Sequence, residues 1–297
     1  MTALGPELAA QPSAPIKGRS LWDDARRRLF RNRAAVVSIV MLAVLVIAAI
    51  VGPYLTPYPY DQVNKNDVWV GPLTGAHLIG TDSLGRDLFA RLLIGLRVSL
   101  AVGVVATVVS LVIGVAWGAT AGYLGGRVDE VMMRIVDVLY SLPFIFFVIL
   151  LMVTFGKNFI LMFVAIGAVE WLTMARIVRG QTLSLKEKEF VEAARAGGVS
   201  SAGIVTRHIA PNLLGPVVIY VTLTIPSVIL AESFLSFLGL GVQEPLTSLG
   251  VLISKGAQDM ELAPWLLIFP SIVMVLTLMC FNFIGDGLRD ALDPKDR

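Results

Sequence analysis

The sequence predicts an all-α protein that crosses a membrane six times. Of its 297 residues, 56% are hydrophobic without counting glycine, whereas soluble domains reach about 45–50% with glycine included. Only 15% are charged, and the apolar residues gather in six runs. Each run approaches the ~20 residues needed to cross ~30 Å of hydrocarbon. Backbone polar groups in lipid must be satisfied within their own segment, so these runs are expected to be helices.

The first third of the chain is expected to hold one anchoring helix between two polar segments. Residues 1–33 form a cytoplasmic tail whose second part is basic and amphipathic, like segments that lie on an anionic membrane surface. Residues 34–51 form the first span, which we expect to stay uncleaved because Gly52-Pro53-Tyr54 is a poor signal-peptidase site. Residues 52–95 form an extracytoplasmic loop that ends in an interfacial helix.

Residues 96–284 are expected to form a five-helix core, followed by a cytoplasmic tail at 285–297. Small residues such as Gly114 and Gly118 would let the first core helix approach its neighbours closely. The five apolar runs cover 96–120, 131–153, 159–177, 216–237 and 264–284. The prolines expected to kink these spans are Pro143, Pro226 and Pro270.

The distribution of Lys and Arg orients the predicted spans. With the N-terminus in the cytoplasm, cytoplasmic segments hold 18 of these residues and external segments hold 6. The positive-inside rule therefore favours N- and C-termini that are both cytoplasmic. The same orientation places the polar segment 180–215 in the cytoplasm.

The segment 180–215 is expected to fold as helix, glycine turn, helix. Ser184 and Glu187 have the spacing of a capping box, in which the serine oxygen and the glutamate each satisfy a free backbone N–H. A short helix would follow, from Lys188 through Ala194.

The turn and the second helix have their own signals. Gly197 and Gly198 suit a left-handed C-cap, where a side chain would clash. Ser200 or Ser201 is placed to cap the next helix, and Pro211 is expected to end it.

The first of these helices combines small residues with a single acid. Ala193 and Ala194 would let another surface approach closely, and Glu192 would give that contact a direction. From the residues alone, a docking element and an ordinary helical loop are equally good interpretations.

Three acids lie within apolar runs, where charge is costly and usually faces a cavity or a partner. Asp137 is expected to pair with Arg134 one turn back, and Glu170 to lie toward the cytoplasmic end. Glu232, with Ser233 beside it and no cation near, is the best candidate to line a pathway, although a hydrogen bond to a neighbouring helix explains it equally well. If these acids line a path, they suit a substrate with a positive amine, such as a peptide N-terminus.

No catalytic or cofactor motif is recognisable. The chain contains no GxxxxGK[ST] loop, no GxSxG elbow and no HExxH pair. Cys280 is the only cysteine, and His77 and His208 lie in different loops without the spacing of metal ligands. The net charge of +2 gives no reason to expect nucleic-acid binding. We therefore expect no enzyme active site, cofactor or metal in this chain.

The segment 180–215 resembles the EAA loop of permease subunits from bacterial ABC importers. The resemblance is carried by Glu189, Glu192-Ala193-Ala194, Gly198 and Pro211. It implies a core like that of type I ABC importer permeases and a coupling helix that sits in a cleft of an ATPase subunit. His208 and Ala210 depart from the general pattern and are closer to the variant in dipeptide and oligopeptide importers.

Two further segments are similar to that sub-family. They are Gly80-Thr81-Asp82-Ser83-Leu84-Gly85-Arg86-Asp87, followed by Arg91, Gly95 and Arg97, and the tail from Gly285 to Pro294. Together they indicate the C-type of two related permeases. The resemblance implies these partners: a second homologous permease, two ATP-binding subunits that hold ATP and Mg, an extracytoplasmic solute-binding protein, and a peptide substrate, in the inner membrane of a bacterium.

Other interpretations stay open at this point. Relatives in the same family carry nickel, glutathione or opines. A secondary transporter driven by an ion gradient would use the intramembrane acids, but it would be expected to show an internal repeat, and none is visible. A passive scaffold for other membrane chains is the remaining alternative.

Overall fold

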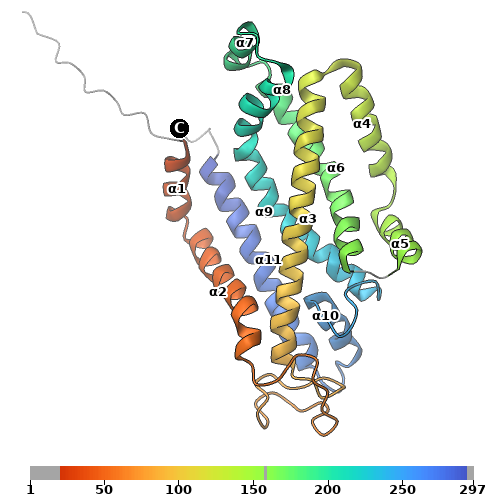
Figure 1. Ribbon diagram of the computed structural model, residues 1–297. Coiled ribbons are helices and arrows are strands. Elements are labelled where there is room, and N and C mark those ends of the chain that lie inside the picture. The colour runs from red at the N-terminus through yellow and green to blue at the C-terminus, as the bar shows by residue number, and fades with distance from the viewer. Residues whose placement is uncertain (1–20, 157–158, 293–297) are drawn as a thin grey trace, which may run out of the picture.

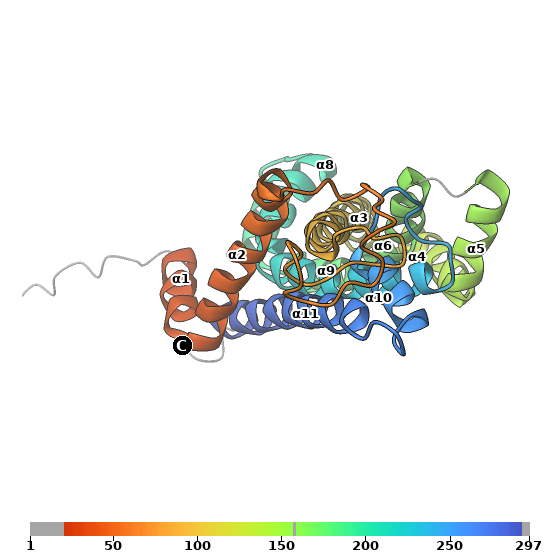
Figure 2. The same cartoon turned by 90° about the horizontal axis from the view of Figure 1, so that it is seen from below.

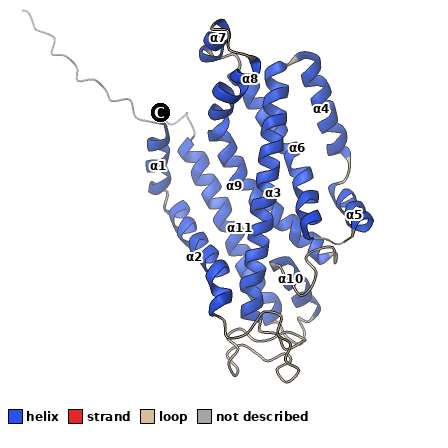
Figure 3. Cartoon of the chain, in the orientation of Figure 1, coloured by secondary structure: helices blue, strands red, loops and turns tan. Residues whose placement is uncertain are grey.

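The computed structural model describes residues 21–156 and 159–292, a bundle of helices in which the described residues form no β-strand (Figure 1, Figure 3). The helices, in chain order, are α1 Leu21–Arg31, α2 Arg33–Leu55, α3 Leu88–Leu124, α4 Gly126–Ser141, α5 Phe144–Phe155, α6 Phe159–Leu185, α7 Glu189–Ala196, α8 Ser201–Ile204, the π-helix η1 Val205–Ile209, α9 Ala210–Phe237, α10 Leu249–Gln258 and α11 Trp265–Leu292. The all-α prediction is confirmed.

Within the described ranges, four helical segments are long and apolar enough to cross a membrane. They are α2, α3, α11 and the continuous stretch Ser201–Phe237, and α4 with α5 would make a fifth if the bent pair is one span. The prediction of several spans is confirmed, but the count of six is not reproduced. The run predicted at 159–177 is helical as part of α6, which is not among these segments.

Helix α3 runs the length of the bundle and packs most extensively on α6 (Figure 1). Glycine makes this approach possible. A Cβ at Gly114 would lie 2.6 Å from the Cβ of Met174, and one at Gly118 would lie 2.4 Å from the carbonyl oxygen of Ala175. Both distances are too short for a side chain, as the small-residue pattern predicts.

The second and first spans are longer than predicted. The expected interfacial helix and the run 96–120 are one helix, α3. After the N-cap, this segment contains glycine but no proline, the residue that breaks helices most strongly. That cap is Asp87, whose carboxylate accepts from the backbone N–H of Ala90 at 2.8 Å. Similarly, α2 continues past residue 51 to Leu55.

The third predicted span is not one helix. It breaks into α4 and α5, whose axes differ by 82°. Leu142 is extended, with φ −75° and ψ 130°, and Pro143 is the N-cap of α5. The break has a simple cause, because proline lacks the N–H that would continue the helix and drives the preceding residue out of the α region. Pro226 and Pro270, by contrast, lie inside helices that continue past them.

The two ends of the bundle differ. Helices α7 and α8 lie at one end with α1 and the C-terminal end of α11 (Figure 1). The loop from 56 to 87 and α10 lie at the opposite end, which faces the viewer in Figure 2. The predicted tail at 285–297 begins as helix, because α11 continues to Leu292.

We expect Gly118→Ala to lower the thermal stability of the protein, because the added methyl group cannot fit between α3 and α6. Overpacking of this kind costs about 1–3 kcal/mol. Gly180→Ala in α6 is the matched control, since nothing lies within 4 Å of a Cβ there, and alanine favours a helix interior. Thermal unfolding in detergent would measure both, and equal midpoints for the two variants would contradict the packing argument.

Candidate functional site

Helix α7 projects from one end of the bundle and exposes two acids and a small residue (Figure 1). Glu189, Glu192 and Ala193 are exposed, and Ala194 is half-buried. Both glutamates lie in the first turn, where a negative charge is favoured by the helix dipole. The surface predicted for docking is therefore open in this chain.

The opposite face of α7 holds it to the bundle. Val191 is fully buried in an apolar cluster with Ile204, Ile209 and Leu213. Arg195 lies over the ring of Tyr123 from α3, with 6.0 Å between the guanidinium carbon and the ring centroid. A force on α7 would therefore reach the start of α9 and the end of α3 through direct contacts.

The glycine turn after α7 is a Schellman motif. Gly198 has φ +75°, the left-handed conformation predicted for it, while Gly197 has φ −73°. The N–H of Val199 donates to the carbonyl of Ala194 at 3.1 Å, and that of Gly198 donates to Arg195 at 3.1 Å. This pair of bonds defines the motif and fixes the direction in which the chain leaves α7.

The capping box predicted at Ser184 is wrong. Helix α6 continues to Leu185, and the Ser184 hydroxyl donates to the carbonyl of Gly180 at 3.5 Å within that helix. The N-cap of α7 is Lys188, which makes no side-chain cap. Helix α6 therefore extends past residue 177, where the predicted apolar run ends, and includes Ser184.

Ser200 caps the second helix, as predicted, by accepting from the N–H of Gly203 at 3.2 Å. The prediction that Pro211 ends this helix is wrong. The chain stays helical from Ser201 to Phe237 because it passes through the π-helix η1 before the proline. Pro211 then occupies the first turn of α9, where the missing N–H is tolerated.

Asp137 does not pair with Arg134. Its carboxylate accepts from Nη2 of Arg176 in α6 at 2.8 Å, and both side chains are partly exposed. A second ion pair joins the same helices, since Arg179 donates to both oxygens of Asp129 at 2.5 and 2.6 Å. The prediction considered only the spacing of Arg134 and Asp137 along one helix, and it therefore missed Arg176 on another helix.

Glu232 is fully buried and joins three helices. Its carboxylate accepts from Ser236 and Ser248 at 2.6 Å and from Ser99 of α3 at 3.2 Å. Ser248 is also the N-cap of α10 and accepts from the N–H of Val251. The sequence left two interpretations open, a pathway-lining residue and a residue hydrogen-bonded to neighbouring helices. Within this chain, the contacts of Glu232 are those of the second.

Ser233 lies beside Glu232 in sequence but takes no part in this cluster. Its hydroxyl contacts the sulfur of Met274 in α11 at 3.7 Å. Glu170 is half-buried on α6, beside the break between α4 and α5. The acids expected to share a pathway are therefore in separate environments within the chain.

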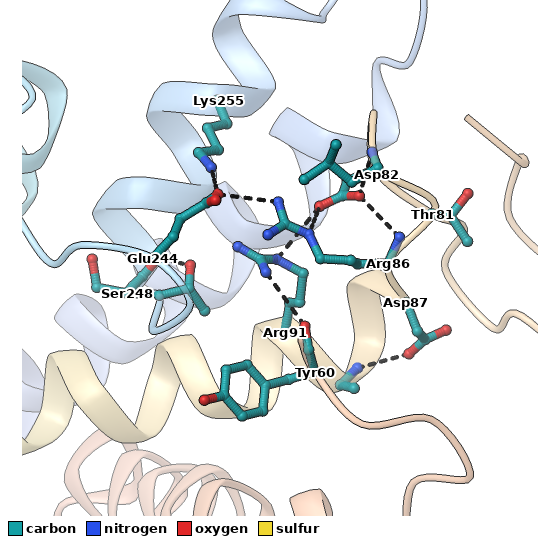
Figure 4. Close-up of polar contacts among 12 residues, drawn as sticks. Tyr60, Thr81, Asp82, Arg86, Asp87, Arg91, Glu244, Ser248 and Lys255 are labelled. Atoms are coloured by element: carbon teal, nitrogen blue, oxygen red, sulfur yellow. Dashed lines mark hydrogen bonds and ion pairs between the residues drawn. The ribbon is translucent and has the colours of Figure 1, made fainter. Parts of the chain in front are cut away.

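A polar cluster at the end opposite α7 was not predicted as a site (Figure 4). Buried Arg86 donates to Asp82 at 2.7 Å and to Glu244 at 3.2 Å, and Glu244 also pairs with Lys255 of α10. Buried Arg91 donates to the carbonyl of Tyr60 at 3.3 Å. The GTDSLGRD segment, which is the last part of the 56–87 loop, is thus bound through Arg86 to the connection between α9 and α10.

The charges around Glu244 affect its titration. Lys255 in the first place, and then Arg86, hold the pKa of the Glu244 carboxyl at about 2, although partial burial opposes this.

Elsewhere at this end, His77 Nδ1 lies 2.8 Å from a carboxylate oxygen of Asp87. No group of three His, Cys, Asp or Glu residues that could hold a metal occurs among the described residues.

Comparison with known proteins gives consistent results. Residues 110–297 match the family described as binding-protein-dependent transport system inner membrane component, and residues 20–72 match the N-terminal TM domain of oligopeptide transport permease C. The chain is 60% identical to the oligopeptide transport system permease protein OppC of Escherichia coli (strain K12), over 95% of this chain and 94% of that protein.

Two relatives from Bacillus subtilis (strain 168) are more distant. OppC is 43% identical over 95% of this chain and 92% of its own length, and the dipeptide transport system permease protein DppC is 44% identical over 94% and 87%. Among solved structures, a chain of the MetNI methionine ABC transporter in an inward-facing conformation has a TM-score of 0.55. It shares 21% identity, with 68% of this chain and 96% of that chain covered, which is a likeness of fold.

We expect Glu232→Gln to destabilise the protein by about 1–3 kcal/mol, because an amide places a donor against hydroxyl groups that themselves donate. Hydrogen exchange at the N–H groups of Leu249 and Val251 should also become faster. Exposed Glu261 offers the same substitution as a control. Unchanged exchange in α10 would show that the cluster does not hold that helix.

We expect Glu244 to make the protein acid-sensitive. Because its pKa is lowered in the folded state, its contribution to stability is complete above the ordinary value of 4.5 and is lost as the pH falls toward about 2. The contribution should be below about 1 kcal/mol, because the side chain is partly exposed. Glu244→Gln should therefore reduce the loss of thermal stability between pH 5 and pH 2, in a comparison of unfolding midpoints. A steeper loss in the variant would contradict this assignment.

Proposed function

Because the chain belongs to the family of binding-protein-dependent transport system inner membrane components, we propose that it is the C-type permease subunit of an ABC importer for oligopeptides or dipeptides. The observation that carries the proposal is α7, an exposed helix that is packed through Val191 onto the membrane helices and whose two glutamates have no ion pair within the described part of the chain. The names and identities of the relatives support the choice of peptide as substrate.

The proposed orientation places α7, α1 and the end of α11 in the cytoplasm. Support comes from their common position at one end of the bundle and from the excess of Lys and Arg in the segments predicted to be cytoplasmic. The 56–87 loop and α10 would then face an extracytoplasmic solute-binding protein. Both termini would be cytoplasmic, in the inner membrane of a bacterium.

In the proposed mechanism, this chain makes and breaks no covalent bond. A binding protein delivers the peptide at the outer end, and two ATP-binding subunits bind ATP and Mg and close on each other. Their movement is passed to α7 and, through the cluster around Val191, to α9 and α3. A second, homologous permease would complete the pathway, which opens alternately to the two sides.

The test is a mild-detergent purification of the tagged full-length chain, followed by an ATPase assay of the proteins recovered with it. The proposal expects a second permease, the ATP-binding subunits, and ATPase activity that increases when binding protein and peptide are added. Recovery of the chain alone, with transport that follows a proton or sodium gradient and is indifferent to ATP, would overturn it.

We expect Glu192→Lys to reduce peptide uptake by about ten-fold or more, because reversing a charge at an interface opposes the docking of an ATPase subunit. Uptake is measured with the complete transporter in proteoliposomes. Exposed Glu187, just before α7, offers the same reversal as a control, and it should retain near-normal uptake.

Gly198→Trp should also uncouple transport without loss of the protein from the membrane, since a side chain is strained at φ +75°. Normal uptake by both the Glu192→Lys and the Gly198→Trp variants would contradict the coupling role.

A further inference from the structure

A cavity of about 610 Å³ lies where α4 ends and α5 turns away, against residues 168–173 of α6. This volume is in the range of small-molecule binding sites. Its lining is amphiphilic. Leu142, Pro143 and Phe147 give it apolar walls, whereas Tyr140, Glu170 and Thr173 bring polar groups to it.

Glu170 is the only acid that lines this cavity, and within the described ranges its carboxylate has no hydrogen bond or ion pair. Arg176, the first basic residue after Glu170 along α6, is engaged elsewhere. It pairs with Asp137 at 2.8 Å and lies over the ring of Tyr140, with 4.1 Å to the centroid. The cavity therefore contains a negative group that the described chain leaves unmatched.

Glu170 belongs to a run that the sequence predicts to lie in the membrane, where lipid is an unsuitable neighbour for a carboxylate. Charged groups in such segments usually face a cavity, a partner or a transported species.

The end of α4 adds a second negative feature at the same place. Tyr140 and Ser141 form the last turn of this 16-residue helix and line the cavity. The final carbonyl groups of a helix carry a partial negative charge. In α4 those of Val138 and Leu139 accept from the Ser141 hydroxyl at 2.7 Å and from the Leu142 N–H at 3.3 Å, and those of Tyr140 and Ser141 have no partner among the described residues. A carboxylate and a helix C-terminus thus meet in one cavity, and both favour a cation.

Glu170 is held in position by its surroundings. The neighbouring Trp171 packs edge-on against Trp117 of α3, with 5.3 Å between ring centroids, and Trp117 donates to the carbonyl of Met132 in α4 at 3.2 Å. The two ion pairs between α4 and α6 fix the same wall. The cavity is therefore formed by the end of α4, by α5 and by α6, and contacts with α3 hold the α6 wall in place.

We propose that this cavity binds the α-ammonium group of a transported peptide, with Glu170 as its counter-ion and the end of α4 as a second acceptor. The inference rests on the proposed function, since it names a substrate contact within that transport cycle. A primary ammonium fits because it is compact, carries three donors and can accept a carboxylate and helix carbonyls together. The aromatic and aliphatic walls would cover the first side chain of the peptide without specifying it.

The first experiment compares Glu170→Gln with wild type in proteoliposomes that hold the complete transporter and its binding protein. Uptake of a free-amine tripeptide should fall by about ten-fold or more, the effect of losing one charge-assisted hydrogen bond. ATPase stimulation by peptide-loaded binding protein should stay near the wild-type value, and Glu170→Asp should restore part of the uptake. Exposed Glu130 on α4 offers the same change to Gln outside the cavity as a control.

The outcomes separate this inference from the proposed function. Normal uptake by Glu170→Gln would overturn the inference while the importer remains active. Loss of the second permease on purification of Glu170→Gln would also overturn it, because Glu170 would then pair with a basic residue of that partner. Absence of peptide-stimulated ATPase activity in the wild type would refute the proposed function itself.

The second experiment tests the cavity without transport. Thr173 is exposed, lines the cavity and lies one helical turn from Glu170. In the complete transporter, a Thr173→Cys variant should react faster with a cationic thiosulfonate than with an anionic one, and a free-amine peptide should slow the reaction. Glu170→Gln should remove the preference for the cationic reagent. The parent chain is the control, because its one thiol, Cys280, is buried. Equal rates with the two reagents would overturn the proposal.

Discussion

The close contact between α3 and α6 is the interaction on which the rest of this structure depends. Two glycines on α3 bring the helices together so tightly that a methyl group at either position would collide with α6. In lipid, apolar side chains gain little by leaving one apolar surface for another, so close packing of this kind is a main source of helix association. The contact then determines where α4, α7 and α9 lie.

Both candidate sites follow from that contact. Helix α6 leads directly into the short segment before α7, so the position of α6 sets the position of the exposed glutamates. The same helix carries Glu170 and the two arginines that hold α4. At the other end, α3 supplies Ser99 to the Glu232 cluster and Arg91 to the polar cluster of the outer loop. A movement of α3 against α6 would therefore change contacts at both ends of the bundle.

The acids on the long helices have a different role from the one that the sequence indicates for isolated acids. Glu232 accepts three hydroxyl hydrogen bonds, and Asp137 and Asp129 each meet an arginine from α6. These acids hold helices together. Glu170 differs because it lines a cavity and has no such partner in the described chain. The distinction depends on contacts between distant segments, which a reading of one segment does not contain.

Several local features were determined by the sequence itself. Apolar run length predicted several of the spans, although not their number, and the glycine pair and Ser200 predicted the turn after α7, because each depends on residues within a few positions. Pro143, which was expected to kink its span, lies where that span breaks into α4 and α5.

Only the tertiary structure decided the rest. Pro211 is accommodated in a continuous helix by the π-helix before it, and Asp137 finds its arginine 39 positions away. The hydrogen bonds that Glu232 accepts from Ser99 and Ser248 also depend on the packed bundle. The physical reason is that a buried charge or a helix end is satisfied by whichever group the fold brings near, and sequence spacing describes only the neighbours within one helix.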